Sequence, residues 1–161
     1  MGQVVTLPEA GRIRADARAA GRRVVLTNGY FDLLHVGHTR YLQQARALGD
    51  VLFVGVNADA TARRAKDLRR PILPENERAE MLAALGCVDY VVLFSEDTAQ
   101  RLVEVLKPDV YVKGGDYDRA SLPEAAAVDE YGGLIEILPF QQGHSTTDIV
   151  ETVLQRYGPS P

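Results

Sequence analysis

Residues 27–38 read Thr27-Asn28-Gly29-Tyr30-Phe31-Asp32-Leu33-Leu34-His35-Val36-Gly37-His38. An apolar run, Val24-Val25-Leu26, precedes this stretch. Behind it, apolar and aromatic side chains recur at the helical spacings of three and four, at Tyr41, Leu42, Ala45 and Leu48. The pattern therefore predicts a strand, a loop and a helix in succession, with both histidines in the first turn of the helix.

The start of that helix has the properties of an anion site. Backbone N–H groups at a helix N-terminus are unpaired and carry the positive end of the macrodipole, so they stabilise negative charge. His35 and His38 lie on one face of the helix, and Gly37 has no Cβ to keep a phosphate away from the backbone. An isolated His-x-x-His pair is usually an ordinary surface feature, but the preceding strand and the Asn28-Gly29 bend favour a phosphate site.

A zinc site is the other interpretation of two neighbouring histidines. Helical zinc pairs usually lie four residues apart and have an acid nearby. His144 is the third histidine, and the single cysteine, Cys87, falls in an apolar segment. We therefore predict no metal ion held by protein side chains.

Composition limits the class of protein. The chain has 161 residues, of which 46% are hydrophobic and 25% charged, and its net charge is −4. These values predict one domain with a sizeable core and argue against nucleic-acid binding, which a basic surface normally drives. The N-terminus lacks the apolar segment of a signal peptide, and no apolar run approaches the roughly 20 residues that cross a bilayer. We expect a cytoplasmic protein with no membrane partner.

The remaining chain alternates apolar runs with helical patterns. Further strands are predicted at 51–56, 88–94, 109–112 and 134–138, and helices at 7–20, from the 57–61 turn, and at 75–85, 97–106, 124–130 and 148–157. Alternating strands and helices form parallel βαβ units, whose ligands bind beyond the carboxyl ends of the strands. The loops Thr27–His38, Lys113–Asp116 and Gly143–Thr147 should therefore line one cleft.

The His35-Val36-Gly37-His38 motif after Thr27–Asp32 resembles the signature of the cytidylyltransferase-like nucleotidyltransferase superfamily. The resemblance implies an α/β, Rossmann-like fold with a five-stranded parallel sheet in the order 3-2-1-4-5 and helices on both faces. It also implies a single nucleotidyltransferase domain over 1–161, with an N-terminal helix over 1–21 and a catalytic core over 22–157. Its reaction joins a phosphate monoester to a nucleotide and releases pyrophosphate.

Within this superfamily the chain is most similar to the adenylyltransferases that make ADP-heptose from D-glycero-β-D-manno-heptose 1-phosphate. The matching segments are residues 27–32, 48–50, 56–59, 70–71, 112–117 and 145–147. Glycerol-3-phosphate cytidylyltransferases share His35–His38 and Ser145–Thr147, but they typically carry an arginine where this chain has Phe140. Transfer to glycerol phosphate, ethanolamine phosphate or a flavin mononucleotide, use of CTP or GTP, and a non-catalytic nucleotide sensor remain the alternatives.

The chemistry assigns roles to the cleft residues. The attacking phosphate is already anionic, so the reaction needs alignment and charge stabilisation rather than a general base. The expected catalytic residues are His35, His38, Thr146 and Lys66, with at least one imidazole protonated beside the phosphates. The resemblance assigns nucleotide contacts to Thr27, Asn28, Gly29, Tyr30, Phe31, His35, Gly37, His38, Lys113, Gly114, Asp116, Ser145, Thr146 and Thr147.

Four side chains are weaker candidates for binding the acceptor or its phosphate: Asp32, Lys66, Arg70 and Arg78. Each has a structural alternative. Asp32 can shape its loop, Lys66 and Arg70 can belong to a solvated basic face, and Arg78 can form a surface salt bridge with Glu75 or another acid. Likewise, Ser145 or Thr146 can serve only as a helix N-cap.

The resemblance also implies partners. ATP would arrive with Mg²⁺, a sugar 1-phosphate would be the acceptor, and a separate sugar kinase would act in the same pathway. A homodimer is expected on the same ground. Where many relatives carry Glu-Asp-Gly-Cys before the serine, this chain has Gln141-Gln142-Gly143-His144, so two carboxylates near the nucleotide are missing.

Overall fold

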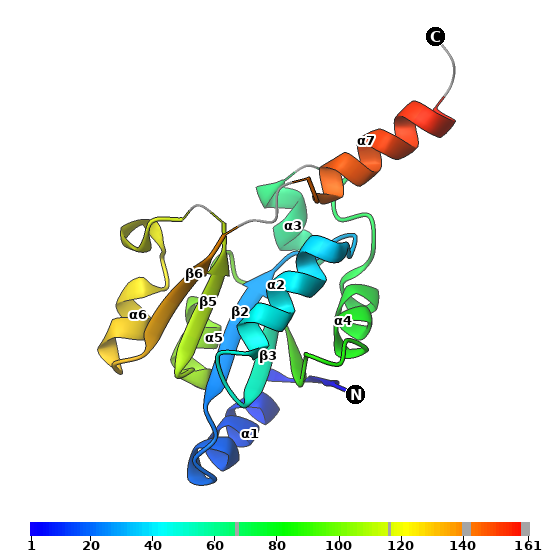
Figure 1. Ribbon diagram of the computed structural model, residues 1–161. Coiled ribbons are helices and arrows are strands. Elements are labelled where there is room, and N and C mark those ends of the chain that lie inside the picture. The colour runs from blue at the N-terminus through cyan, green and yellow to red at the C-terminus, as the bar shows by residue number, and fades with distance from the viewer. Residues whose placement is uncertain (67, 116, 140–142, 159–161) are drawn as a thin grey trace.

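A parallel six-stranded sheet forms the centre of the protein in a computed structural model that describes residues 1–66, 68–115, 117–139 and 143–158 (Figure 1). The sheet order is β1-β4-β3-β2-β5-β6, and every neighbouring pair is parallel. The strands are β1 (Gln3–Val5), β2 (Val24–Gly29), β3 (Val51–Asn57), β4 (Tyr90–Phe94), β5 (Val110–Gly114) and β6 (Leu134–Leu138).

Five of these strands were predicted, and their predicted order is confirmed, because the order 3-2-1-4-5 corresponds to β4-β3-β2-β5-β6. The predicted sheet was nevertheless one strand short. β1 pairs with β4, placing Gln3 opposite Tyr90 and Val5 opposite Val92. It is three residues long and partly exposed, so it has too few residues for a recognisable alternation. This segment forms a strand only because it pairs with the edge of β4. The segment 1–21, predicted as a helix, therefore contains a strand followed by a helix.

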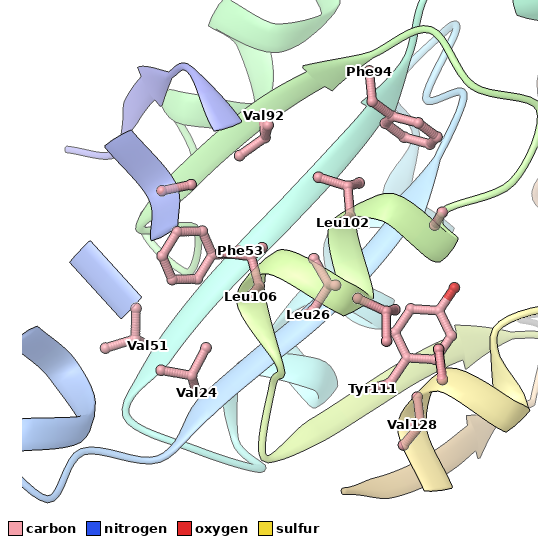
Figure 2. Close-up of a cluster of buried hydrophobic side chains, with 14 of the residues drawn as sticks. Val24, Leu26, Val51, Phe53, Val92, Phe94, Leu102, Leu106, Tyr111 and Val128 are labelled. Atoms are coloured by element: carbon pink, nitrogen blue, oxygen red, sulfur yellow. The ribbon is translucent and has the colours of Figure 1, made fainter. Parts of the chain in front are cut away.

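Helices cover both faces of the sheet because the strands alternate apolar side chains between them. One core lies under α1 (Leu7–Ala19), α5 (Gln100–Leu106) and α6 (Ala125–Glu130), and it includes Leu26, Phe53 and Tyr111 (Figure 2). The other lies under α2 (Val36–Arg46) and α4 (Glu75–Ala83). Successive residues of β2 divide between them, since Val24 and Leu26 join the first core and Val25 joins the second.

The carboxyl edge of the sheet carries the elements that matter for function. α3 (Asp59–Ala65) follows β3, and the 3₁₀ turn η1 (Arg119–Ser121) follows β5. α5 begins three residues later than the sequence predicts, which leaves Asp97 and Thr98 in the loop after β4. α7 (Thr146–Tyr157) begins at this edge and extends away from the sheet (Figure 1), and Val153, Leu154 and Tyr157 are exposed on it. No described helix has the length and apolar character that crossing a membrane requires.

Candidate functional site

A cleft of about 740 Å³ lies at the carboxyl edge of the sheet. It brings together the three loops that topology predicted to meet there, after β2, β5 and β6. The predicted site residues that line it are Asn28, Gly29, Tyr30, Phe31, Asp32, His35, Gly37, His38, Lys66, Arg70, Lys113, Gly114, Ser145, Thr146 and Thr147. Thr27 and Arg78 do not line it. Asp116, with Phe140 and the Gln141-Gln142 pair, lies outside the described residues.

The two histidines of the motif stack on each other at the start of α2. His35 is the N-cap residue and His38 lies in the first turn, with their ring centroids 3.8 Å apart and an interplanar angle of 23°. Phe31, in the left-handed region at φ 48°, places its ring edge-on against His38 at 5.2 Å. A non-glycine residue in this region is strained, and such strain concentrates at functional sites.

Burial disfavours the charged form of both imidazoles. It lowers the pKa of His38 to about 4, with a smaller contribution from the neighbouring His35. The pKa of His35 is also lowered, by burial and then by His144. Without a ligand both rings thus favour the neutral form, whereas the prediction of a protonated imidazole concerns the state beside bound phosphates. Bound phosphates would raise both pKa values. The Nδ1 atoms of His35 and His38 are buried and have no hydrogen-bond partner within the described part of the chain.

The pKa of His38 predicts how stability depends on pH. A histidine in the unfolded chain titrates near pH 6.5, so between that pH and about 4 the unfolded chain binds a proton that His38 in the folded protein does not. The free energy of unfolding should therefore fall as pH falls through this window and be free of this effect above it. Urea unfolding at several pH values should give a shallower dependence for His38→Asn than for the wild type. Equal slopes would mean that His38 titrates normally in the folded protein.

Gly37, in the first turn of α2, lies against the side chains of His35 and His144. A Cβ at this position would lie 2.9 Å from His35 Nδ1 and 3.1 Å from the Cβ of His144. The glycine therefore allows His35 and His144 to approach the backbone of α2, in addition to the access for phosphate that the sequence suggested. His144 lines the cleft, as its place in the predicted 143–147 loop implies, although no role was predicted for its side chain.

The start of α7 forms the wall of the cleft that faces the start of α2. Ser145 is its N-cap, and its Oγ accepts a hydrogen bond of 3.0 Å from the backbone N–H of Asp148. Thr146 Oγ1 donates to the Leu33 carbonyl at 3.4 Å, which joins α7 to the loop before α2. Two helix N-termini and two imidazoles therefore face one space. This arrangement is suited to the oxygens of a polyphosphate.

Three of the weaker candidates, Asp32, Arg70 and Lys66, lie around the loop that follows α3 and differ in their contacts. Asp32 accepts hydrogen bonds from the backbone N–H groups of Ile72 at 2.7 Å and Leu73 at 3.1 Å, and it pairs with Arg70 at 3.0 Å. These contacts give Asp32 the loop-shaping role and fix Arg70 at the cleft. Lys66 lies over the ring of Tyr30, with Nζ 5.5 Å from the centroid, and it also lines the cleft.

Arg78 lies below the site rather than in it. Its guanidinium is fully buried and donates to the carbonyls of Tyr30, Leu73 and Asn57, and it pairs with Asp59 at 2.7 Å. These partners leave it no access to a ligand, and its acidic partner is Asp59 rather than Glu75. The geometry thus gives Arg78 a structural role, holding together the loops after β2, β3 and α3.

Thr27 is also a support for the cleft floor. It is fully buried, and its hydroxyl lies 2.6 Å from that of Tyr41, which in turn donates to the Val112 carbonyl at 3.3 Å. Tyr41 therefore ties α2 to β2 and β5 directly beneath the histidines. The helical spacing had placed Tyr41 in the apolar stripe of this helix, and its hydroxyl gave no sequence signal.

The cleft includes residues that sequence reasoning missed. They are Tyr41, Asn57, Ala62, Pro71, Asp97, Thr98, Tyr117, Leu122, Pro123, Glu124 and Pro139. Asn57 could have been found, because it ends a buried strand at the carboxyl edge. Asp97, Thr98 and Glu124 come from segments whose sequence is typical of loops and helix starts, so only their position in three dimensions identifies them.

The acids that line the cleft do not form a metal cage. Among the described residues no three His, Cys, Asp or Glu side chains are grouped so that they could hold a metal ion. Asp32 is occupied by Arg70 and two backbone N–H groups, and Asp97 pairs with Arg64. Mg²⁺ usually keeps several waters and binds through substrate phosphates. An ion bound in that way does not require a group of three protein ligands.

Comparison with families and sequences gives a consistent result. The family model described as cytidylyltransferase-like matches residues 26–152. The bifunctional protein HldE of Geobacter metallireducens is 53% identical over 149 residues, which cover 92% of this chain and 30% of that protein. The HldE protein of Pseudomonas aeruginosa is 52% identical over 141 residues, with 88% and 30% covered. The chain thus spans about 30% of the length of these curated relatives.

Solved structures share the fold. The lipopolysaccharide core biosynthesis protein from Thermoplasma volcanium superposes with a TM-score of 0.64 at 33% identity, covering 77% of this chain and 100% of that one. A pantoate–β-alanine ligase from Francisella tularensis, complexed with an ATP analogue and β-alanine, gives a TM-score of 0.63 at 15% identity, covering 94% and 77%. The second similarity shows the fold alone.

Proposed function

The chain belongs to the cytidylyltransferase-like family of nucleotidyltransferases, and from this membership we propose that it transfers AMP from ATP to a sugar 1-phosphate. The proposed acceptor is D-glycero-β-D-manno-heptose 1-phosphate, and the products are ADP-heptose and pyrophosphate. Support comes from the similarity of 92% of the chain to a bifunctional HldE protein at 53% identity. Residues 1–161 form the proposed nucleotidyltransferase unit.

One observation carries the proposal: the N-termini of α2 and α7 meet at the cleft with the stacked histidines between them. His35, His38, Ser145, Thr146 and Thr147 all line this space. Backbone N–H groups, hydroxyls and imidazoles are donors to phosphate oxygens, and their position at two positive dipole ends favours a ligand with several negative charges. A triphosphate has this character.

The proposed reaction is an in-line displacement at the α-phosphorus. An oxygen of the acceptor's phosphate forms a new bond to the α-phosphorus of ATP, the bond from that phosphorus to the bridging oxygen breaks, and pyrophosphate leaves with the electron pair. His38 and His35 donate hydrogen bonds to the oxygens where charge develops, and Thr146 adds a hydroxyl donor. Lys66 and Arg70, on the other side of the cleft, neutralise the acceptor phosphate or the departing pyrophosphate. Mg²⁺, bound to the triphosphate, supplies further charge neutralisation.

The remaining parts of the proposal concern partners. A sugar kinase activity would supply the sugar 1-phosphate, and the reaction would take place in the cytoplasm, where ATP is available. A homodimer stays a prediction from the family resemblance. A nucleotide contact by Gly114 is proposed because this residue lines the cleft.

The test is pyrophosphate release by the purified protein with Mg²⁺. ATP, CTP and GTP should each be combined with heptose 1-phosphate and with glycerol 3-phosphate. We expect release with ATP and the heptose phosphate. Release with CTP and glycerol 3-phosphate would instead identify a cytidylyltransferase, and no release in any pair while ATP still binds would favour a nucleotide sensor.

A further inference from the structure

Side-chain alternation along β2 and β5 divides the cleft into two sides. Gly29 and Gly114 belong to the α2 side, where a Cβ on Gly114 would lie 3.0 Å from the Tyr41 ring. Asn28 faces the α5 side, because a Cβ on the neighbouring Gly55 would lie 3.2 Å from the Cβ of Asn28 and 2.6 Å from Leu102 of α5. Since strand residues two apart share a face, Lys113 lies on the same side as Tyr111. The anion-binding groups described above line the α2 side.

The α5 side of the cleft presents fixed hydrogen-bond donors. Asn28 Oδ1 accepts from the Tyr111 hydroxyl at 2.7 Å and from Lys113 Nζ at 3.2 Å. Two donors on the oxygen fix the orientation of the amide, and no described residue accepts from its Nδ2 group. Lys113 is held between the rings of Tyr111 and Tyr117, at 5.8 and 5.6 Å. Because Asn28 Oδ1 accepts a hydrogen bond from only one ammonium N–H, the other N–H groups of Lys113 can donate to a ligand.

A buried carboxylate completes this side. Glu124, the N-cap residue of α6, is 2% exposed and lines the cleft. Its Oε1 accepts a hydrogen bond of 2.8 Å from the backbone N–H of Ala99. Its Oε2 is buried without a hydrogen bond of good geometry in the described part of the chain, although the Tyr111 hydroxyl and the Lys113 ammonium group lie near this carboxylate. A buried carboxylate oxygen without a well-aligned donor is destabilising. A donor that enters with a ligand would relieve this destabilisation.

The charges on this side decide the kind of group that fits. A phosphate would be repelled by Glu124, whereas a hydroxyl group can donate to a carboxylate and accept from an amide or an ammonium group. We propose that the α5 side of the cleft binds the hydroxyl groups of the acceptor sugar and that Glu124 is its specificity-determining residue. This inference rests on the proposed transfer to a sugar phosphate, and it adds which residues recognise the sugar.

The variant that tests this inference is Glu124→Gln. Its amide oxygen can still accept from Ala99, so the start of α5 stays capped, but a donor replaces Oε2. We expect the KM for heptose 1-phosphate to rise about tenfold, since a charge-assisted hydrogen bond is lost, while the KM for ATP changes less than twofold. Glu130→Gln is the matched control, because Glu130 is an exposed glutamate at the end of the same helix.

Calorimetric titration with heptose 1-phosphate alone separates this inference from the proposed function. If the wild type binds the sugar phosphate but releases no pyrophosphate, the proposed function fails. Weaker binding by Glu124→Gln than by Glu130→Gln would still support the role of Glu124. Equal effects of Glu124→Gln on both KM values, identical behaviour of the two variants, or no binding by the wild type would overturn the inference. Thermal midpoints of both variants should stay close to that of the wild type.

Discussion

His38→Ala is expected to lower kcat by on the order of 10²- to 10³-fold, which is the effect of removing one preorganised donor to charge that develops in a transition state. The geometry behind this expectation is the stacked pair of imidazoles at the N-terminus of α2, facing the start of α7 across the cleft. Stability should change little, because the alanine removes a partly buried ring whose Nδ1 has no partner among the described residues. Steady-state pyrophosphate release and thermal denaturation measure the two quantities.

Arg40→Ala is the control for this variant. Arg40 lies on α2 two residues beyond His38, and its side chain is exposed, so its removal should leave both kcat and the midpoint nearly unchanged. A loss of stability in His38→Ala large enough to account for the lost activity would return His38 to a purely structural role. Near-normal kcat in a folded variant would remove His38 from the proposed chemistry.

Arg78→Met is expected to cause the largest loss of stability, about 3–5 kcal/mol, because it removes one partner of a buried ion pair and leaves polar groups unpaired. The carbonyls of Tyr30, Leu73 and Asn57 would lose these donors, and of its ion pairs among the described residues Asp59 would keep only that with Arg63, at 4.0 Å. For a chain of this size, that loss corresponds to a fall in the thermal midpoint of roughly 10 °C or more. Calorimetry or far-UV circular dichroism would measure it.

Arg101→Met is the matched control for Arg78. Arg101 is an exposed arginine on α5 whose ion pair is with Glu104, three residues away. Surface pairs of this kind contribute little, so this variant should unfold close to the wild-type midpoint. If Arg78→Met instead kept its stability and lost affinity for a phosphate substrate, the original hypothesis of a phosphate-binding arginine would be restored.

His38 and Arg78 differ in how much of their role could be assigned from the sequence. His38 could be proposed from sequence because its signal is local: a strand, a loop and a helix start lie within one short segment, and the physics of a helix N-terminus requires no distant partner. Arg78 could not be assigned in this way. On the helix it resembles a surface arginine, and only the loops after β2, β3 and α3, folded around it, turn it into a buried support.

The sequence by itself determined the alternation of strands and helices and the three loops that meet at the carboxyl edge, while the family resemblance supplied the order of the five predicted strands. It could do so because hydrophobic periodicity and the handedness of βαβ units are short-range properties. It did not predict β1, since a three-residue strand exists only through pairing with the edge of β4.

Only the tertiary structure decided the finer chemistry of the cleft. The low pKa of His38 depends on burial by the surrounding fold and on the ring of His35. The pairing of Asn28 with Tyr111 and Lys113, and the approach of Glu124 to Ala99, join residues that are far apart in the chain. Hydrogen bonds, desolvation and charge act over a few ångströms in space, so their effects on a side chain are fixed only when the whole sheet and its helices have brought those neighbours together.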